Sequence, residues 1–318
     1  MSNNFKNNMI KVVPYRDILA RAWDVVVSSS MAGNFLHLRK YMDYHSDRFV
    51  DCSLIVERSG KPVAVFPASQ HGRTIISHGG LTYGGLLATN ELRIEDTLHV
   101  FSEIREYYRS LGVEKLIYKA IPYVYQRYPA QEDLYALYRF GAKVTRRDVS
   151  SVIELCKDFK YSKGRKWSIN KAKKAGVVLR VNDDFSSFYN LLFSVLKKFD
   201  TTPTHNLTEL VLLHSRFPLQ IVLYEALLGS ELLAGGVIYD FGDTVHTQYL
   251  ASSDNGREVG ALDYLLSHLI ENVYDDRRFF SFGISTEESG QKLNKGLISQ
   301  KEGFGARAVV HDFYEWIL

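Results

Sequence analysis

A short motif occurs twice in this chain, and each copy lies at the same point in a similar series of predicted elements. The first copy, Phe140–Lys143, is followed after three residues by Arg147–Asp148 and then by an apolar strand. The second copy, Phe304–Arg307, is followed after three residues by His311–Asp312 and then by another apolar strand. Self-similarity of this kind indicates that one structural unit has been duplicated.

The elements upstream of the two motifs are predicted in the same order. Each half contains a hairpin, a third strand, a long amphipathic helix and a further strand, as judged from apolar alternation, turn residues and helical apolar spacing. In the first half these are 53–57 with 62–68, 74–78, 94–111 and 115–120, and in the second 220–226 with 232–239, 244–252, 258–274 and 278–284. The repeat therefore predicts two consecutive α/β units of one architecture.

The length and composition agree with two folded domains. A chain of 318 residues fits two cores of ordinary size, and its 46% hydrophobic and 24% charged residues are typical of globular proteins. Polar and basic residues replace the apolar pattern near Lys157–Gly164, so we expect domains at residues 1–156 and 157–318. The net charge of +3 gives no reason to expect extended nucleic-acid binding.

The termini and cysteines bear on the compartment. The segment Met1–Asn8 is polar and is not followed by the apolar core of a secretory signal. The longest apolar runs fall far short of the ~20 residues that cross a bilayer, so no membrane span is expected. Cys52 and Cys156 lack His or Cys partners at metal spacing, and they fit buried thiols in a reducing cytosol, with a disulfide as the alternative. We expect a cytoplasmic protein with no metal.

The order of three strands, helix, strand, helix and strand resembles the GNAT (acetyltransferase-like) fold. More narrowly, Lys166–Val177 looks like the basic helix that opens the second domain of Fem-type aminoacyltransferases and their relatives. The segments Phe282–Glu287, Leu293–Leu297 and Lys301–Gly305 are similar to the C-terminal signature of Fem-like GNAT proteins, which are often linked to cell-surface polysaccharide biosynthesis. The resemblance covers most of the chain and is specific in the second half.

This resemblance implies an α/β (α+β) chain of two tandem GNAT-like domains, each a mixed, mostly antiparallel sheet flanked by helices. The first domain would be degenerate and the second would carry the main site. The implied activity is an N-acyltransferase that moves an acyl group, most simply acetyl from acetyl-CoA, to the amino group of an amino sugar or nucleotide-linked sugar precursor. A homodimer is compatible with the sequence.

Two other functions remain as alternatives. One is a Fem-like aminoacyltransferase that takes its acyl group from aminoacyl-tRNA and modifies a peptidoglycan precursor. The chain has no heptads for the coiled-coil arm that many Fem proteins carry, and its modest charge weighs against a tRNA partner. The other is a non-catalytic module that only binds or scaffolds.

The segment Asp254–Ala261 is the candidate phosphate cradle, because glycine lets backbone amides approach a phosphate and a helix N-terminus carries partial positive charge. It resembles the GNAT pyrophosphate loop, although only one glycine follows Arg257 and Glu258 adds negative charge. An ordinary polar loop, with Asp254 or Asn255 capping the next helix, is the alternative. The candidate cofactor-binding residues are Ala251, Gly256, Arg257, Gly260 and Ala261.

The strand before this cradle supplies the candidate catalytic residues. Strict alternation along 244–252 places His246 and Gln248 on one face and Tyr249 on the other. His246 can act as a base near neutral pH, and Tyr249 can donate a proton to a departing thiolate. The alternatives are a hydrogen-bonded structural histidine and a packed tyrosine.

Polar residues near other element ends are the candidate substrate-binding group. Ligands of α/β sheets gather at the carboxyl ends of strands, which favours the residues after 278–284. A helix cap at Ser285 or Thr286, with Glu287 and Glu288 in the first turn, is the alternative. The loop 200–206 adds a second base candidate, and the first domain contributes aromatic lining. The full set is Tyr83, His205, Ser285, Glu287, Lys301 and Glu302.

The basic segment 163–174 admits two interpretations. Its lysines and arginine could contact the phosphates of a nucleotide-sugar or of a tRNA acceptor stem. It could instead be the solvated face of a helix that turns Trp167, Ile169 and Ala172 inward. The second interpretation is favoured, because no aromatic residues are interleaved with a long basic stripe.

Overall fold

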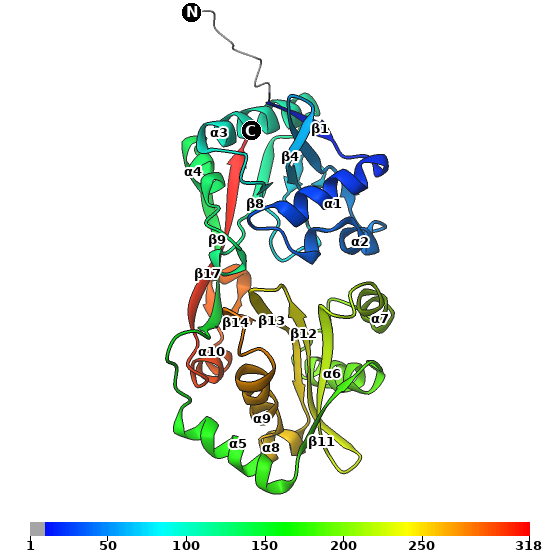
Figure 1. Cartoon of the computed structure of the whole chain (residues 1–318), viewed down its shortest axis with the longest axis vertical. Coiled ribbons are helices and arrows are strands. Elements are labelled where there is room, and N and C mark those ends of the chain that lie inside the picture. Colours follow the sequence, from blue (N-terminus) through cyan, green and yellow to red (C-terminus); the bar gives the residue numbers. More distant parts are fainter. Residues whose placement is uncertain (1–9) are drawn as a thin grey trace, which may run out of the picture. The chain divides into compact units, whose positions relative to one another are not determined.

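The computed structural model describes residues 10–318, so the prediction made for Met1–Asn8 lies outside the described residues. The chain forms two compact units. Unit 1 extends to Asp148 and also includes Val310–Leu318, and unit 2 is Val149–Val309. Each unit combines sheets with helices, as Figure 1 shows.

Unit 1 contains two sheets. Its elements are β1 (Ile10–Pro14), α1 (Ala20–Ser29), α2 (Arg39–Met42), β2 (Val50–Asp51), β3 (Leu54–Arg58), β4 (Lys61–Phe66), β5 (Ser69–His71), β6 (Thr74–Ile76), β7 (Leu87–Ala88), α3 (Ile94–Ser110), β8 (Lys115–Lys119) and α4 (Glu132–Arg139). One sheet has the antiparallel order β1-β3-β4-β7. In the other, β8 pairs in parallel with β6, and β5 and β2 follow.

Unit 2 is built on a single mixed sheet. Its elements are α5 (Lys163–Ala175), β10 (Val178–Asn182), α6 (Ser186–Lys197), α7 (Leu207–Arg216), β11 (Ile221–Leu228), β12 (Glu231–Asp240), β13 (Thr244–Ser252), α8 (Asp254–Val259), α9 (Ala261–His268), β14 (Phe279–Ile284), β15 (Thr286–Glu287), β16 (Lys292–Leu293) and α10 (Lys295–Glu302). The sheet order is β10-β11-β12-β13-β14, and only the β13–β14 pair is parallel.

Helices cover both faces of this sheet, as Figure 1 shows. On one face, Leu265 and Leu266 of α9 pack with Ile238 and Val245 of the strands in the buried core. On the opposite face, Phe188 of α6 lies against the backbone of β12. We call these the α9 face and the α6 face. The expected mixed, mostly antiparallel sheet flanked by helices is confirmed.

The repeated motif has one local structure in both places. Gly141 and Gly305 both adopt left-handed backbone angles, with φ of 79° and 88°. In each copy the alanine after this glycine donates its N–H to a carbonyl five residues earlier, which is a helix-ending bond pattern. The first motif therefore ends α4 and the second ends α10, as duplication requires.

The strand that follows each motif differs from the predicted arrangement. The strand β9 (Lys143–Glu154) begins in unit 1 and pairs with β14 of unit 2. The strand β17 (Arg307–Ile317) begins in unit 2 and pairs with β8 of unit 1. Each repeat thus donates its last strand to the sheet of the other, so the units are not the continuous segments 1–156 and 157–318. The sequence of a strand does not show which other strand it pairs with.

Among the described residues of unit 1, four histidines are buried: His37, His45, His78 and His311. Burial lowers the pKa of His37 to about 4, of His78 to about 3 and of His311 to about 4. These three side chains are therefore neutral in the folded protein at pH 7. Burial also raises the pKa of Asp133 to about 6, and Tyr118 donates a hydrogen bond to that carboxyl group.

The histidines make the free energy of unfolding sensitive to acid. In the unfolded chain, His311 has an ordinary pKa of ~6.5 and binds a proton below that pH. In the folded chain, it binds a proton only near pH 4 and below. We expect stability to fall through this window, and His311→Gln to reduce the slope by roughly 1.4 kcal/mol per pH unit. The raised pKa of Asp133 changes stability with pH in the opposite direction. Its contribution is the same in the parent chain and in the variant, so it cancels when their slopes are compared.

Urea unfolding of both proteins at pH 7.5, 6.0 and 5.0 measures this slope. His99→Gln is the matched control, because His99 is exposed on α3 of the same unit. An equal slope in the parent chain and in His311→Gln would contradict the assignment.

Candidate functional site

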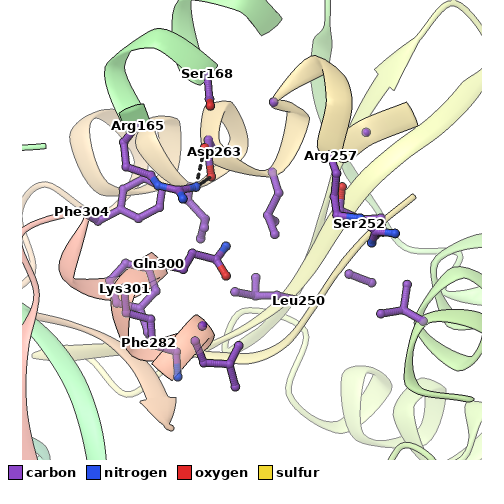
Figure 2. A pocket seen from close by; sticks show the side chains of 18 residues that line it. Arg165, Ser168, Leu250, Ser252, Arg257, Asp263, Phe282, Gln300, Lys301 and Phe304 are labelled. Carbon is purple, nitrogen blue, oxygen red and sulfur yellow. Dashed lines mark hydrogen bonds and ion pairs between the residues drawn. The ribbon is translucent and has the colours of Figure 1, made fainter. Parts of the chain in front are cut away.

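A cavity of about 530 Å³ lies mainly on the α9 face of unit 2, and Val195 of α6 also belongs to its lining. Its lining combines α5, near the start of the unit in the sequence, with α10, near its end, and Figure 2 shows their side chains converging. The apolar part of the lining is Val195, Leu250, Leu262, Leu266, Phe282, Leu297 and Phe304, and the polar part is Arg165, Ser168, Ser252, Arg257, Asp263, Gln300 and Lys301. Ala251, Gly256, Gly260 and Gly296 complete it with small residues.

The strands β13 and β14 part beside this cavity. Their parallel pairing covers only Thr244–Phe279, Val245–Phe280 and His246–Ser281. Beyond that point Leu250 of β13 and Phe282 of β14 both line the cavity. Gly283 has φ of 74°, a backbone angle that side chains disfavour, and it ends the regular course of β14. The opening at the sheet therefore results from a strand pair that stops early.

A β-bulge at Gln248 changes the orientation of the candidate catalytic residues. On β12, Ile238 pairs with Thr247 and the preceding Val237 pairs with Tyr249, which leaves Gln248 as the extra residue. His246 pairs with Tyr239, two residues from Val237, so His246 and Tyr249 lie on the same face. The prediction that they lie on opposite faces was wrong, because strict alternation fails at a bulge.

The expected cradle loop is itself a helix. The short α8 begins after Ser253, whose side chain accepts a 2.9 Å hydrogen bond from the Gly256 N–H. Asp254 and Asn255 are therefore not the cap. Gly260 separates α8 from α9 with φ of 87°, and a Cβ there would lie 2.5 Å from the Ser168 carbonyl oxygen. Glycine is needed for this sharp junction between α5, α8 and α9.

The first turn of α9 faces the cavity without a side-chain cap. Backbone N–H groups in a first turn have no intrahelical partners, and the helix dipole gives them partial positive charge. The buried Asp263 lies in that turn, and Arg165 of α5 contacts its two oxygens at 2.5 and 2.6 Å (Figure 2). Arg257 donates to the Ser252 carbonyl at 2.8 Å and pairs with Asp254.

Lys301 holds the end of β14 in place. Its Nζ donates to the carbonyl oxygens of Gly283 and Ile284 at 2.9 and 2.8 Å and to Ser285 Oγ at 2.8 Å. Burial lowers the pKa of Lys301 to about 8, so the ammonium form dominates at neutral pH and uses all three of its protons here. The residue is a cavity wall and a backbone tether.

A row of polar side chains lies on the α6 face, where β13 and β14 part. His246 Nδ1 lies 3.3 Å from Ser281 Oγ, and the two residues are partners in the sheet register. Ser150 of β9 shares this face, is fully buried, and its Oγ has no hydrogen-bond partner among residues 10–318. His205, from the loop between α6 and α7, places Nδ1 2.7 Å from Tyr249 Oη.

Residues 162–289 match the family model described as "Acetyltransferase (GNAT) domain". Unit 2 contains that segment, with its bulged β13, its parting strands and its uncapped α9. The chain carries a GNAT acyltransferase domain. The match lies within unit 2, which is Val149–Val309, and does not extend to unit 1.

Solved structures share this fold over nearly the whole chain. The crystal structure of FemX is 12% identical and covers 97% of each chain, with a TM-score of 0.68. The C-terminal domain of a putative lysylphosphatidylglycerol synthetase from Agrobacterium fabrum is 11% identical, covers 93% of this chain and 91% of that one, and has a TM-score of 0.63. A tandem GNAT protein from the clavulanic acid biosynthesis pathway is 12% identical, covers 96% and 98%, and has a TM-score of 0.51. No curated protein matches the sequence.

Other predicted site residues lie away from the GNAT cavity. In unit 1, Tyr83 is buried and stacks on Tyr125, with the two ring centres 4.7 Å apart. Its hydroxyl accepts a hydrogen bond from the Asn34 side chain, so Tyr83 is a core residue. Glu287 is exposed in the β15–β16 hairpin and pairs with Lys292, and Glu302 is exposed on α10.

Two further residues are buried structural parts of the GNAT domain. Ala261 is fully buried at the start of α9. Ser285 does not cap a helix, because Asn294 caps α10. Instead, Ser285 binds Lys301.

Sequence reasoning missed several wall residues of the cavity. Arg165 and Ser168 lie in a basic segment whose inward face was assigned to Trp167, yet Trp167 is 64% exposed. Their spacing of three residues on α5 was a usable signal for one shared face. Asp263 and Gln300 carry no such signal, because each looks like an ordinary helix residue.

The remaining expectations concern cysteines, membranes and metals. Both cysteines are free thiols, but Cys156 is exposed rather than buried and Cys52 is only half-buried. Within residues 10–318, no helix combines the length and the apolar character needed to span a bilayer. The same residues contain no cluster of three or more His, Cys, Asp or Glu side chains suited to hold a metal ion.

We predict that Lys301→Met destabilises the GNAT domain by about 2 kcal/mol, because two carbonyls and a hydroxyl lose a charged donor while the apolar stem is kept. Lys295→Met is the matched control, since Lys295 is exposed on the same helix. Chemical unfolding of the two variants gives the comparison. Equal stabilities would show that Lys301 does not tether the end of β14.

Proposed function

We propose that the protein is an N-acyltransferase that moves an acyl group from acyl-CoA to the amino group of an amino sugar or related polysaccharide precursor. One observation carries this proposal: a cavity on the α9 face and a polar row on the α6 face both border the point where β13 and β14 part. A donor and an acceptor can then reach each other from opposite faces of the sheet. The cytoplasm is the compartment that such a donor implies.

The residues of the cavity fit an acyl-CoA donor. The uncapped first turn of α9 offers amide donors for a diphosphate, and Gly260 places no side chain immediately before that turn. Arg165 and Arg257 add positive charge, with Asp263 balancing part of it. Leu250, Leu266 and Phe282 form an apolar path suited to a pantetheine arm. Bound acyl-CoA would supply the acyl group as a thioester, whose C–S bond breaks as the new C–N bond forms.

The α6 face suits a hydroxyl-rich amine. Ser150 is a buried hydroxyl with an unmade hydrogen bond in the described structure, and buried polar groups normally find a partner. Ser281 and His246 lie on the same face, one strand and two strands away. An amino sugar presents several hydroxyl groups for such contacts, and an apolar amine would leave Ser150 without a partner.

Proton transfer can be assigned to the two histidine pairs. An acceptor amine must lose a proton, and His246, half-buried beside Ser281, is the base that we propose. Burial raises the pKa of Tyr249, so this phenol keeps its proton at neutral pH and can give it to the departing thiolate. His205 orients Tyr249 through their 2.7 Å contact. Gln248, as the bulge residue, sets the position of Tyr249.

An aminoacyl ester of tRNA is the second donor that we consider. Asp263 places a carboxylate in the turn where a diphosphate would bind, and Leu262 brings a bulky side chain to the same wall. The carboxylate would repel a diphosphate and the bulky side chain would crowd it, whereas a donor without a diphosphate avoids both effects. The fold likeness to FemX is compatible with this alternative.

A thermal-shift titration with acetyl-CoA and longer acyl-CoAs tests the donor. At about 100 times Kd, binding adds roughly 2.7 kcal/mol, which raises Tm by roughly 5–10 °C for a unit of this size. We expect Arg257→Glu to lose the shift and Arg307→Glu to keep it, because Arg307 is exposed on β17 outside the cavity. No shift with any acyl-CoA at millimolar concentration would reject this donor and favour aminoacyl-tRNA.

The assignment of Tyr249 is tested by Tyr249→Phe. We expect kcat to fall by roughly 100-fold or more, with acyl-CoA affinity unchanged, because phenylalanine keeps the ring and lacks the hydroxyl that donates the proton. Tyr224→Phe is the matched control, because it also removes a tyrosine hydroxyl from the same unit. That hydroxyl is hydrogen-bonded to Tyr274. Thiol release from acyl-CoA in the presence of UDP-linked amino sugars measures the rate. Equal rates for the two variants would exclude the proposed role.

A further inference from the structure

The helix α5 has more basic side chains than its ion pairs and hydrogen bonds within the fold require. Between Lys163 and Ala175 it has six basic residues and no acidic ones. Two have structural tasks: Arg165 pairs with Asp263, and Lys171 donates to the Glu258 carbonyl at 2.8 Å. The other four, Lys163, Lys166, Lys173 and Lys174, form no ion pair with any described carboxylate and are exposed.

These charges follow one side of the helix. Lys163, Lys166, Asn170 and Lys174 recur at spacings of three and four residues, so they form a stripe about 16 Å long. Trp167 lies within this stripe and is 64% exposed, with Lys171 Nζ 5.2 Å from its ring centre. The opposite side of the helix is buried through Ile169 and Ala172. The stripe is therefore a solvent-facing surface with one large indole at its centre.

We propose that this stripe docks the protein on a membrane surface rich in anionic lipid. Lysines near a negatively charged leaflet each add roughly a factor of five to binding, and tryptophan prefers the depth of the lipid headgroups. A single-stranded nucleic acid would instead require several aromatic side chains among the cations, and α5 has only Trp167. The charge of the stripe and its central indole thus favour a lipid surface.

This proposal does not depend on the proposed enzymatic function, because it concerns binding alone. It does connect with the cavity through α5 itself. The buried side of the same helix supplies Arg165 and Ser168 to the cavity wall. Docking through the stripe would hold the cavity one helix diameter, about 10 Å, from the lipid headgroups.

Vesicle binding tests the proposal directly. We expect the full-length protein to sediment with vesicles of equal parts phosphatidylglycerol and phosphatidylcholine at 50 mM salt, and not with pure phosphatidylcholine vesicles. Binding should weaken at least 10-fold at 500 mM salt. The double variant Lys166→Glu with Lys174→Glu should bind at least 30-fold more weakly. The matched control reverses Lys143 and Lys197, which are exposed on other elements, and it should bind like the parent chain.

Tryptophan fluorescence gives an independent readout of the same contact. The chain has three tryptophans, and Trp23 and Trp316 are buried in unit 1, so a shift caused by vesicles reports on Trp167. We expect a blue shift with anionic vesicles that Trp167→Phe abolishes while the fold is retained. Equal binding of the parent chain and the Lys166/Lys174 variant, or binding to single-stranded RNA but not to anionic vesicles, would overturn the proposal.

Discussion

The brief pairing of β13 with β14 is the constraint on which the site depends. Three residue pairs join these strands, and past His246 and Ser281 the sheet has no backbone link between them. An interrupted sheet leaves polar groups that need other partners, and Lys301 supplies them for Gly283 and Ile284. The cavity, the polar row on the α6 face and the kink at Gly283 all follow from this interruption and from the side chain that stabilises it.

Buried charge is used in the GNAT domain mainly to position backbone. Lys301 binds strand carbonyls, and Arg165 binds Asp263 across two helices. Leaving such groups without partners would cost more free energy than the pairs contribute, which explains why each cation of the cavity wall has a fixed task. Amides in the first turn of α9 and the hydroxyl of Ser150 are among the polar groups left for ligands. They lie on opposite faces of one sheet, which is the arrangement that a transfer reaction between two substrates needs.

The two repeats are linked by exchange of their last strands. Because β9 completes the sheet of unit 2 and β17 completes that of unit 1, neither half of the sequence holds all the strands of its own sheet. In unit 1, Arg147 of the first repeat binds Asp312 of the second through two hydrogen bonds of 2.6 and 2.8 Å. Both residues belong to the duplicated motif, so the repeat that reveals the architecture also helps to join its parts.

Local pattern in the sequence determined the duplication, the strands 244–252 and 278–284 and the helix of 94–111, because periodicity and turn residues act over a few positions. Tertiary structure alone decided the rest. The bulge at Gln248 turned His246 and Tyr249 to one face, strand exchange reassigned residues 310–318, and packing buried Tyr83 while it exposed Trp167. These outcomes depend on contacts between residues far apart in the chain, and no local spacing encodes which distant backbone a strand or an aromatic ring will meet.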